Sequence, residues 1–172
     1  MMIVLDVSFR ALEIAAPNAY LSVSEGKLMA DTIEALKEDF SIIDEWEDRY
    51  RYVIELGRGL APLADADRTA RNKVQGCASQ VWIAVHEEKN GKERRLTFSG
   101  DSDALIVKGL IAIIFRLFSG RTPSEILATD AGALLDELDL REHLTPQRSN
   151  GVASMVARIK SDAKTALAHA LN

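Results

Sequence analysis

Cysteine is almost absent from this sequence, in which Cys77 is the one thiol among 172 residues. A single thiol excludes an intramolecular disulfide and a zinc site built from four cysteines. The lack of a disulfide framework agrees with a reducing compartment, so we expect a cytoplasmic protein. If Cys77 takes part in chemistry, it must act as a nucleophile or carrier toward a partner molecule.

Excess positive charge and long apolar runs are also missing. Lys and Arg number 21 against 26 Asp and Glu, a net charge of −5, which argues against a nucleic-acid-binding surface. No stretch approaches the roughly 20 apolar residues of a membrane span. The apolar start of the chain is broken at Asp6, and its first cation is Arg10, which is unlike a signal peptide. We therefore expect no targeting segment and neither nucleic acid nor membrane as a partner.

Histidine is scarce as well. His86, His143 and His169 are scattered along the chain, and isolated histidines are more often surface polar residues than metal ligands. No Cys-x-x-Cys or His-x-x-Glu-His spacing occurs, so we expect no bound metal. No base is clustered with Cys77 to support a protease-like pair.

Length and composition, with 47% apolar and 27% charged residues, are typical of one soluble globular domain. The first 28 residues lack a periodic pattern, and the first clear helical pattern opens at Met29-Ala30-Asp31. We predict an N-terminal extension over residues 1–28, either disordered or the product of a misassigned start, and a domain over 29–172. A genuine flexible tail is the alternative.

The first half of this domain reads as a helix followed by strands. Apolar residues recur at steps of three and four from Ile33 to Ile54, which predicts a helix. Asp44 followed by Glu47 resembles a capping box and suggests a break there. Residues 80–87 and 95–98 alternate as strands around the turn dipeptide Asn90-Gly91, and Val74 is assigned to a short edge strand.

The second half reads as helices. Residues 104–118 are apolar almost all round, which predicts a buried central helix. Thr122-Pro123-Ser124-Glu125 combines an N-cap, a proline at N1 and a glutamate at N3, and so starts a short helix. Another helix follows Asp130, and the last starts near Ser149. The predicted fold is α+β, with helices on one face of a small three-stranded antiparallel sheet.

The surroundings of Cys77 predict a loop tip or strand entrance. Most lone cysteines are core residues, but Gly76, Ala78, Ser79 and Gln80 are small or polar and do not form a core run. Arg71 and Lys73 lie a few positions upstream, where opposite charge can favour a thiolate. Trp46, Tyr50 and Trp82 are expected to be core aromatics, whereas an exposed Trp82 would indicate a docking anchor.

Four blocks of the chain together resemble the SufE family, the sulfur-acceptor proteins of iron–sulfur cluster assembly. They cover about residues 31 to 165, in the family's order. The blocks are Trp46-Glu47-Asp48-Arg49-Tyr50-Arg51-Tyr52-Val53-Ile54-Glu55-Leu56-Gly57, Gln75-Gly76-Cys77-Ala78-Ser79-Gln80-Val81-Trp82, Gly100-Asp101-Ser102-Asp103-Ala104-Leu105-Ile106-Val107-Lys108-Gly109-Leu110 and Leu144-Thr145-Pro146-Gln147-Arg148-Ser149-Asn150-Gly151.

The resemblance implies a fold, a role and partners. The fold would be the SufE/NifU-like (IscU-like) one. Cys77 would accept persulfide sulfur from a PLP-dependent cysteine desulfurase of the SufS or CsdA type, stimulate that enzyme, and pass the sulfur toward a SufBCD-type scaffold. PLP belongs to the desulfurase, so the chain itself would need no cofactor and would have no stand-alone catalysis.

The resemblance also assigns supporting residues. Arg148 lies at the family's Arg-Ser-x-Gly block and would pair with a partner carboxylate or favour the thiolate; an ordinary solvated arginine at a helix start is the alternative. Gly76 and Gln80 would shape the Cys77 loop, together with Ser79. Asp103 belongs to the Gly-Asp-Ser-Asp block, where a favourable charge at a helix start is the simpler role.

Two alternatives to sulfur acceptance are considered. In the first, the protein is a non-covalent adaptor of the cluster-assembly machinery and Cys77 is structural. The second, an IscU-type scaffold, is disfavoured because a cluster needs several thiolate ligands and this chain has one cysteine. The sequence leaves a homodimer open.

Overall fold

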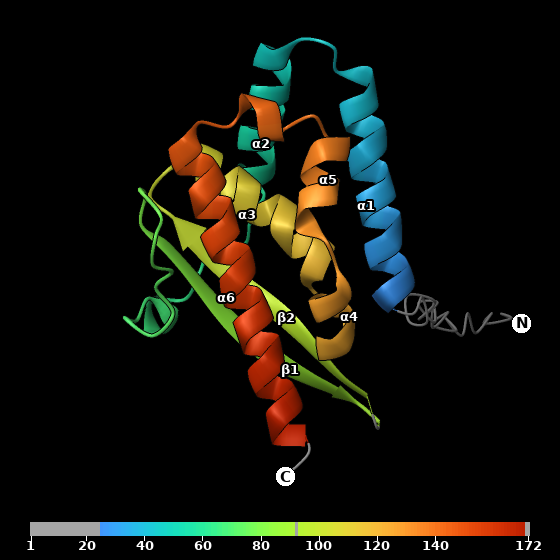
Figure 1. Cartoon of the computed structure of the whole chain (residues 1–172), viewed down its shortest axis with the longest axis vertical. Helices are drawn as coiled ribbons and strands as arrows, with labels where there is room; N and C mark the ends of the chain where they lie inside the picture. The colour runs from blue at the N-terminus through green and yellow to red at the C-terminus, as the bar shows by residue number, and fades with distance from the viewer. Residues whose placement is uncertain (1–24, 92, 171–172) are drawn as a thin grey trace, which may run out of the picture.

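The computed structural model describes residues 25–91 and 93–170, which form α-helices packed on an antiparallel β-hairpin (Figure 1). The α+β class predicted from the sequence is confirmed. In chain order the elements are α1 Glu25–Ile42, α2 Trp46–Arg58, η1 Asp65–Asp67, β1 Val81–Asn90, β2 Glu93–Ser102, α3 Leu105–Phe118, α4 Pro123–Ala128, α5 Ala131–Glu137, η2 Arg141–His143 and α6 Pro146–Ala170.

The sheet has two strands, so the predicted third strand is wrong. β1 pairs with β2 from Val81 opposite Ser102 to Asn90 opposite Glu93. The segment around Val74 adds one isolated bridge, in which Lys73 faces Trp82. The chain is still in a turn at residues 70–72 and enters the Cys77 loop directly after Val74, so there is room for no further pair.

The predicted break between the first two helices is confirmed, but its cap is not. α1 ends at Ile42 and α2 begins at Trp46. Glu45, not Asp44, is the N-cap of α2, and it makes no side-chain capping bond. Arg49 instead reaches back across the gap and donates from Nε to the Ile43 carbonyl at 2.7 Å.

The predicted central helix is α3, which is buried along most of its length and lies in the middle of the fold (Figure 1). It crosses α2 where Gly57 faces Gly109. A Cβ on Gly57 would lie 2.5 Å from the Gly109 nitrogen, a distance that side chains do not tolerate. The two glycines therefore let the backbones of α2 and α3 approach each other closely.

The later helices follow their predicted caps, with one shift. Thr122 and Glu125 form the predicted capping box of α4, and the Asp130 side chain caps α5. The last helix, α6, begins at Pro146 rather than near Ser149, because proline suits a first helical position and the Thr145 hydroxyl accepts from the Arg148 backbone N–H at 3.4 Å. Arg148 therefore lies in the first turn of α6.

Most of the predicted N-terminal extension lies outside the described residues. The described chain begins with α1 at Glu25, inside the predicted 1–28 segment, and the boundary at residue 28 stays a prediction. None of the helices in the described part of the chain is long and apolar enough to cross a membrane.

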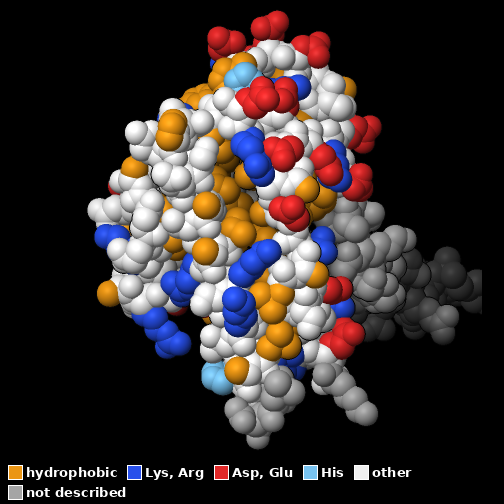
Figure 2. All heavy atoms as spheres, viewed as in Figure 1, with side chains coloured by type: hydrophobic (Ala, Val, Ile, Leu, Met, Phe, Trp, Pro, Cys, Tyr) orange, Lys and Arg blue, Asp and Glu red, His pale blue; other side chains and the backbone are white. Residues whose placement is uncertain are grey.

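The two faces of α6 border two different hollows. On one side lies a cavity that contains Cys77. On the other side an apolar groove of about 480 Å³ runs between α5 and α6 and includes Leu135, Val152 and Val156. Figure 2 shows apolar side chains in the region of this groove, and acidic side chains at the end of the molecule where α1 and α2 meet.

Candidate functional site

Cys77 lies at the tip of a short loop that closes on itself just before β1. The base of this loop is held by the Val74 N–H, which donates to the Val81 carbonyl at 2.9 Å. Gly76 has φ +87°, and a Cβ there would lie 2.7 Å from the Ser154 hydroxyl oxygen of α6. Only glycine meets both demands without strain, so Gly76 sets the turn that directs Cys77 toward α6.

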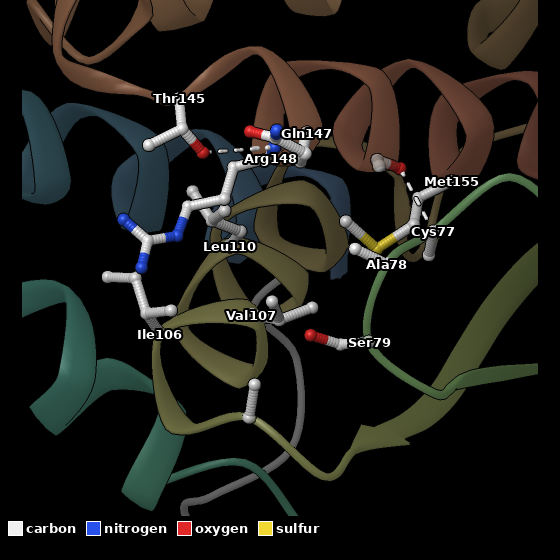
Figure 3. A pocket seen from close by; sticks show the side chains of 12 residues that line it. Cys77, Ala78, Ser79, Ile106, Val107, Leu110, Thr145, Gln147, Arg148 and Met155 are labelled. Atoms are coloured by element: carbon white, nitrogen blue, oxygen red, sulfur yellow. Dashed lines mark hydrogen bonds between the residues drawn. The ribbon is translucent and has the colours of Figure 1, made fainter.

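The Cys77 sulfur faces a cavity of about 180 Å³ between the loop, α3 and α6 (Figure 3). The thiol is half-buried, and its Sγ lies 3.6 Å from the Gly151 carbonyl, to which it donates. The cavity wall is mainly apolar, with a polar rim. Its lining residues are Cys77, Ala78, Ser79, Ala104, Ile106, Val107, Leu110, Thr145, Gln147, Arg148, Gly151 and Met155.

The thiol is held in its neutral form, which contradicts the predicted help from Arg71 and Lys73. Burial raises the pKa of Cys77 above its ordinary value of 9.0, because a buried charge is poorly solvated. The Lys73 ammonium instead donates to Gln80 Oε1 at 3.2 Å. Burial raises the pKa of Asp162 on α6, and the positive charges of Arg158 and Arg71 lower it in part. Lys73 is therefore bonded away from the sulfur, and burial is the cause of the raised pKa of Cys77.

Arg148 shares the cavity with Cys77 but lies at its other end. In Figure 3 its guanidinium points away from the sulfur, with Leu110 between them in this view. The guanidinium carbon is 5.7 Å from the centre of the Tyr50 ring, a cation–π contact. Within residues 25–91 and 93–170, Arg148 forms no ion pair. Its charge is thus available to a molecule that docks at the rim.

Gln80 and Asp103 join the two ends of the hairpin beside the loop. The Gln80 backbone N–H donates to Asp103 Oδ1 at 3.0 Å, and the Asp103 N–H donates to the Gln80 carbonyl at 3.3 Å. Neither residue lines the cavity. The structure thus places both where they support the loop, and places Ser79 in the cavity wall.

Trp82 is half-buried, which fits neither a core aromatic nor an exposed docking anchor. Two cations lie over its ring, with Arg68 at 5.5 Å and Lys73 at 5.9 Å from the centroid. Arg68 also pairs with Asp101, to which Lys108 is 2.8 Å away. Burial alone would raise the pKa of Asp101, but hydrogen bonds from Lys108, Arg68 and Ser102 lower it below its ordinary value. These contacts fasten the connection before the loop to the hairpin.

Several cavity residues were not predicted from the sequence. Thr145, Gly151 and Met155 were considered only as members of a helix pattern or a family block. The spacing of Gln147, Gly151 and Met155, four residues apart on one helix, places them on one face. This spacing indicates a shared helix face, and placing the start of α6 at Pro146 adds Gln147 to it.

The site offers one reactive group, the Cys77 thiol. No group of three His, Cys, Asp or Glu suited to a metal ion occurs among the described residues. The His143 ring stacks on the Trp46 ring, with the two ring centroids 4.1 Å apart. What the arrangement provides is a single thiol that is sheltered by apolar side chains, carried on a short loop, and accompanied by an uncompensated arginine.

The sequence of this chain is similar to those of known proteins. A family model described as "Fe-S metabolism associated domain", SufE, matches residues 34–163. An uncharacterized SufE-like protein of Rhizobium meliloti is 50% identical over 133 residues, which are 77% of this chain and 95% of that protein. An uncharacterized SufE-like protein of Rhizobium etli is 49% identical over 138 residues, 80% of this chain and 93% of that protein.

A solved structure supports the fold. The solution structure of a hypothetical protein from Thermus thermophilus superposes with a TM-score of 0.59 at 20% identity, covering 81% of this chain and 96% of that one. At this level of identity the likeness concerns the fold alone.

Proposed function

The chain belongs to the SufE family of domains associated with Fe-S metabolism, and from this premise we propose that Cys77 is a sulfur acceptor. It takes persulfide sulfur from a cysteine desulfurase of the SufS or CsdA type and passes it toward cluster assembly, with a SufBCD-type scaffold as recipient. The observation that carries this proposal is the position of Cys77. The one cysteine of the chain lies at a loop tip with its sulfur in a sheltered cavity.

The transfer is a thiol–persulfide exchange. The Cys77 thiolate attacks the terminal sulfur of the donor persulfide, a new sulfur–sulfur bond forms to Cys77, and the donor's own sulfur–sulfur bond breaks. The donor cysteine leaves as a thiolate, so no external oxidant or reductant is needed. The proton that Cys77 gives up balances the one that the donor thiolate takes up.

Burial sets a condition on this step. Because burial raises the pKa of Cys77, the thiol inside the cavity is a poor nucleophile. Outside the cavity water solvates the thiolate, and the pKa returns toward its ordinary value. Transfer therefore requires the loop tip to leave the cavity, which also brings the sulfur within reach of a donor on another protein.

The cavity suits the product as well as the resting thiol. Its volume of about 180 Å³ is several times the roughly 30 Å³ share of one water molecule in the liquid, so a second sulfur atom fits beside Cys77. Persulfides are lost by reduction and oxidation, and apolar walls such as Val107 and Met155 keep reagents in water away.

Arg148 is proposed to act at the contact with the donor. Among the described residues, no carboxylate forms an ion pair with its guanidinium, which lies at the rim of the cavity. A planar fork of donors suits a carboxylate on the desulfurase. In this role Arg148 positions the donor, while Gly76, Gln80 and Asp103 hold the geometry of the loop.

The adaptor function remains the second candidate, favoured by the half-buried sulfur and its bond to Gly151. Stimulation of a SufS-type desulfurase by wild-type protein and by Cys77→Ser separates the two. Serine retains the shape but cannot form a persulfide, so we expect Cys77→Ser to remain folded and to lose stimulation. Full stimulation by a folded Cys77→Ser protein would establish the adaptor function and overturn the covalent one.

A further inference from the structure

One face of α6 contacts the segment that carries Cys77 at three places along the segment. Gly151 accepts from the Cys77 sulfur, Ser154 faces Gly76, and Arg158 donates from Nη1 to the Arg71 carbonyl at 2.9 Å. Positions three and four residues apart share one helix face. The segment from Arg71 to Cys77 therefore lies along α6 in the opposite direction.

These contacts differ in strength. The sulfur contact is long at 3.6 Å, and thiols are weak donors. Ser154 and Gly76 approach each other closely without a hydrogen bond between them. The Arg158 contact is a short bond from a charged donor, and such bonds are about twice as strong as neutral ones. Arg158 is thus the strongest attachment of the segment to α6.

Arg158 is itself fixed in place. Its Nε lies 3.1 and 3.0 Å from the two carboxylate oxygens of Asp162, one turn further along α6. The side chains are only 20% and 18% exposed, whereas Arg51 and Asp48 on α2 are 75% and 57% exposed. Screening by water is therefore weaker here than for an ordinary surface pair. Burial raises the pKa of Asp162 above its ordinary value, and the charges of Arg158 and of Arg71 oppose this shift.

The location of this attachment defines what can move. On the β1 side the loop is closed by the bond between Val74 and Val81. On the upstream side the last strong contact with α6 is the one between Arg158 and Arg71. Between these points Asn72 is also bonded to β1, because its carbonyl accepts from the Ile83 N–H at 2.8 Å. The segment therefore moves with the start of β1, and its tip is held against α6 by the Cys77 sulfur and by apolar contact with the cavity.

We infer that Arg158, oriented by Asp162, is a positioning residue that keeps the Arg71–Cys77 segment on α6 and so sets how often Cys77 leaves its cavity. This inference rests on the function proposed above, in which the sulfur must leave the cavity to meet its donor. Without Arg158 the segment, together with the start of β1 to which it is bonded, can move away from α6, and the thiol is exposed more often.

Alkylation of the native full-length protein by iodoacetamide tests this inference without any partner protein. Cys77 is the one thiol of the chain, so the rate of mass gain reports its exposure. We expect Arg158→Ala to raise the rate about tenfold, as the loss of one charge-assisted hydrogen bond implies. Arg158→Lys keeps the charge but lacks the planar guanidinium. Its alkylation rate should lie between those of the wild type and of Arg158→Ala.

Lys160→Ala is the matched control. Lys160 is a cation two residues further along α6, and it donates to the Leu127 carbonyl near the end of α4 rather than to the loop. Its removal should leave the alkylation rate near that of the wild type. Circular dichroism melts of all variants separate local release of the loop from general loosening of α6.

The outcomes divide clearly. Faster alkylation of Arg158→Ala, a partial effect of Arg158→Lys and no effect of Lys160→Ala support the inference. Wild-type rates in both Arg158 variants, or an equal rise in Lys160→Ala, overturn it. If Arg158→Ala does not fold, Arg158→Lys decides alone: a faster rate supports the inference and an unchanged rate overturns it. None of these results depends on sulfur transfer, so the proposed function stands or falls separately.

Discussion

At the scale of single residues, the protonation of Cys77 governs reactivity. Burial raises the pKa of its thiol in the folded protein, so the folded state holds the proton more tightly than the unfolded chain does. The resulting stability is fully present below the unfolded pKa and is lost as the pH rises through the folded pKa. The same burial protects the thiol from reagents at neutral pH.

This protonation state predicts the pH dependence of alkylation. The rate of reaction of native Cys77 with iodoacetamide should rise with pH to a midpoint above that of the same protein unfolded in urea. The unfolded protein is the internal control, because its thiol is solvated. A native midpoint equal to or below the unfolded one would mean that cations, not burial, dominate the environment of the sulfur.

Arg148 offers a second test at this scale. Replacing it with Ala removes a cation–π contact with Tyr50, which is worth about 0.5–1 kcal/mol at an exposed site. We expect a small change in urea stability and a clear fall in desulfurase-dependent sulfur transfer, which Arg148→Lys restores only in part. Arg51→Ala, which removes an exposed α2 arginine, is the control.

Transfer at the wild-type level together with a large loss of stability would make Arg148 structural. The sequence named both Cys77 and Arg148 as candidates, and both line one cavity, but their roles stay predictions. The predicted help from Arg71 and Lys73 was wrong. Sequence proximity to Cys77 did not reveal that the Lys73 side chain bonds Gln80 instead, nor that burial raises the pKa of the thiol.

At the scale of elements, periodicity and turn chemistry predicted most of the fold. Local signals sufficed for the capping box of α4 and the cap of α5, because the groups involved are three or fewer residues apart. The third strand was wrong because one pair, Lys73 with Trp82, is all that the neighbouring turns allow. Alternation of a few residues does not show whether a neighbouring strand has room to extend.

The Cys77 loop predicts a marked effect of Gly76→Ala. Its φ of +87° and the nearness of Ser154 should make this substitution destabilise the protein by about 1–3 kcal/mol and expose Cys77 to faster alkylation. Urea unfolding and alkylation kinetics measure the two effects. Gly91→Ala is the matched control, since Gly91 also has positive φ, +62°, but has open space around it.

Faster alkylation in Gly76→Ala but not in Gly91→Ala is the expected pattern. The double variant Gly76→Ala with Ser154→Ala should recover part of the stability, because the crowding is relieved while the backbone strain remains. If Gly76→Ala were as stable as the wild type and no more reactive, the loop would not depend on this turn.

At the scale of the whole molecule, the helices serve to position one sulfur atom. The Gly57–Gly109 approach seats α3 against α2, α3 provides the apolar floor of the cavity, and α6 provides its polar rim and the attachments of the loop. Family membership rests on residues 34–163, which include all of these parts. Sulfur acceptance is the function that this arrangement supports best.

The most direct measurement is the mass of the intact protein, and then of its peptides, after incubation with a cysteine desulfurase and free cysteine. Sulfur acceptance by Cys77 predicts a gain of about 32 Da, one sulfur atom, on the peptide that contains this residue, removed by thiol reductant and absent without cysteine or in Cys77→Ser. An unmodified Cys77 while the desulfurase consumes cysteine, or sulfur found elsewhere on the chain, would contradict it.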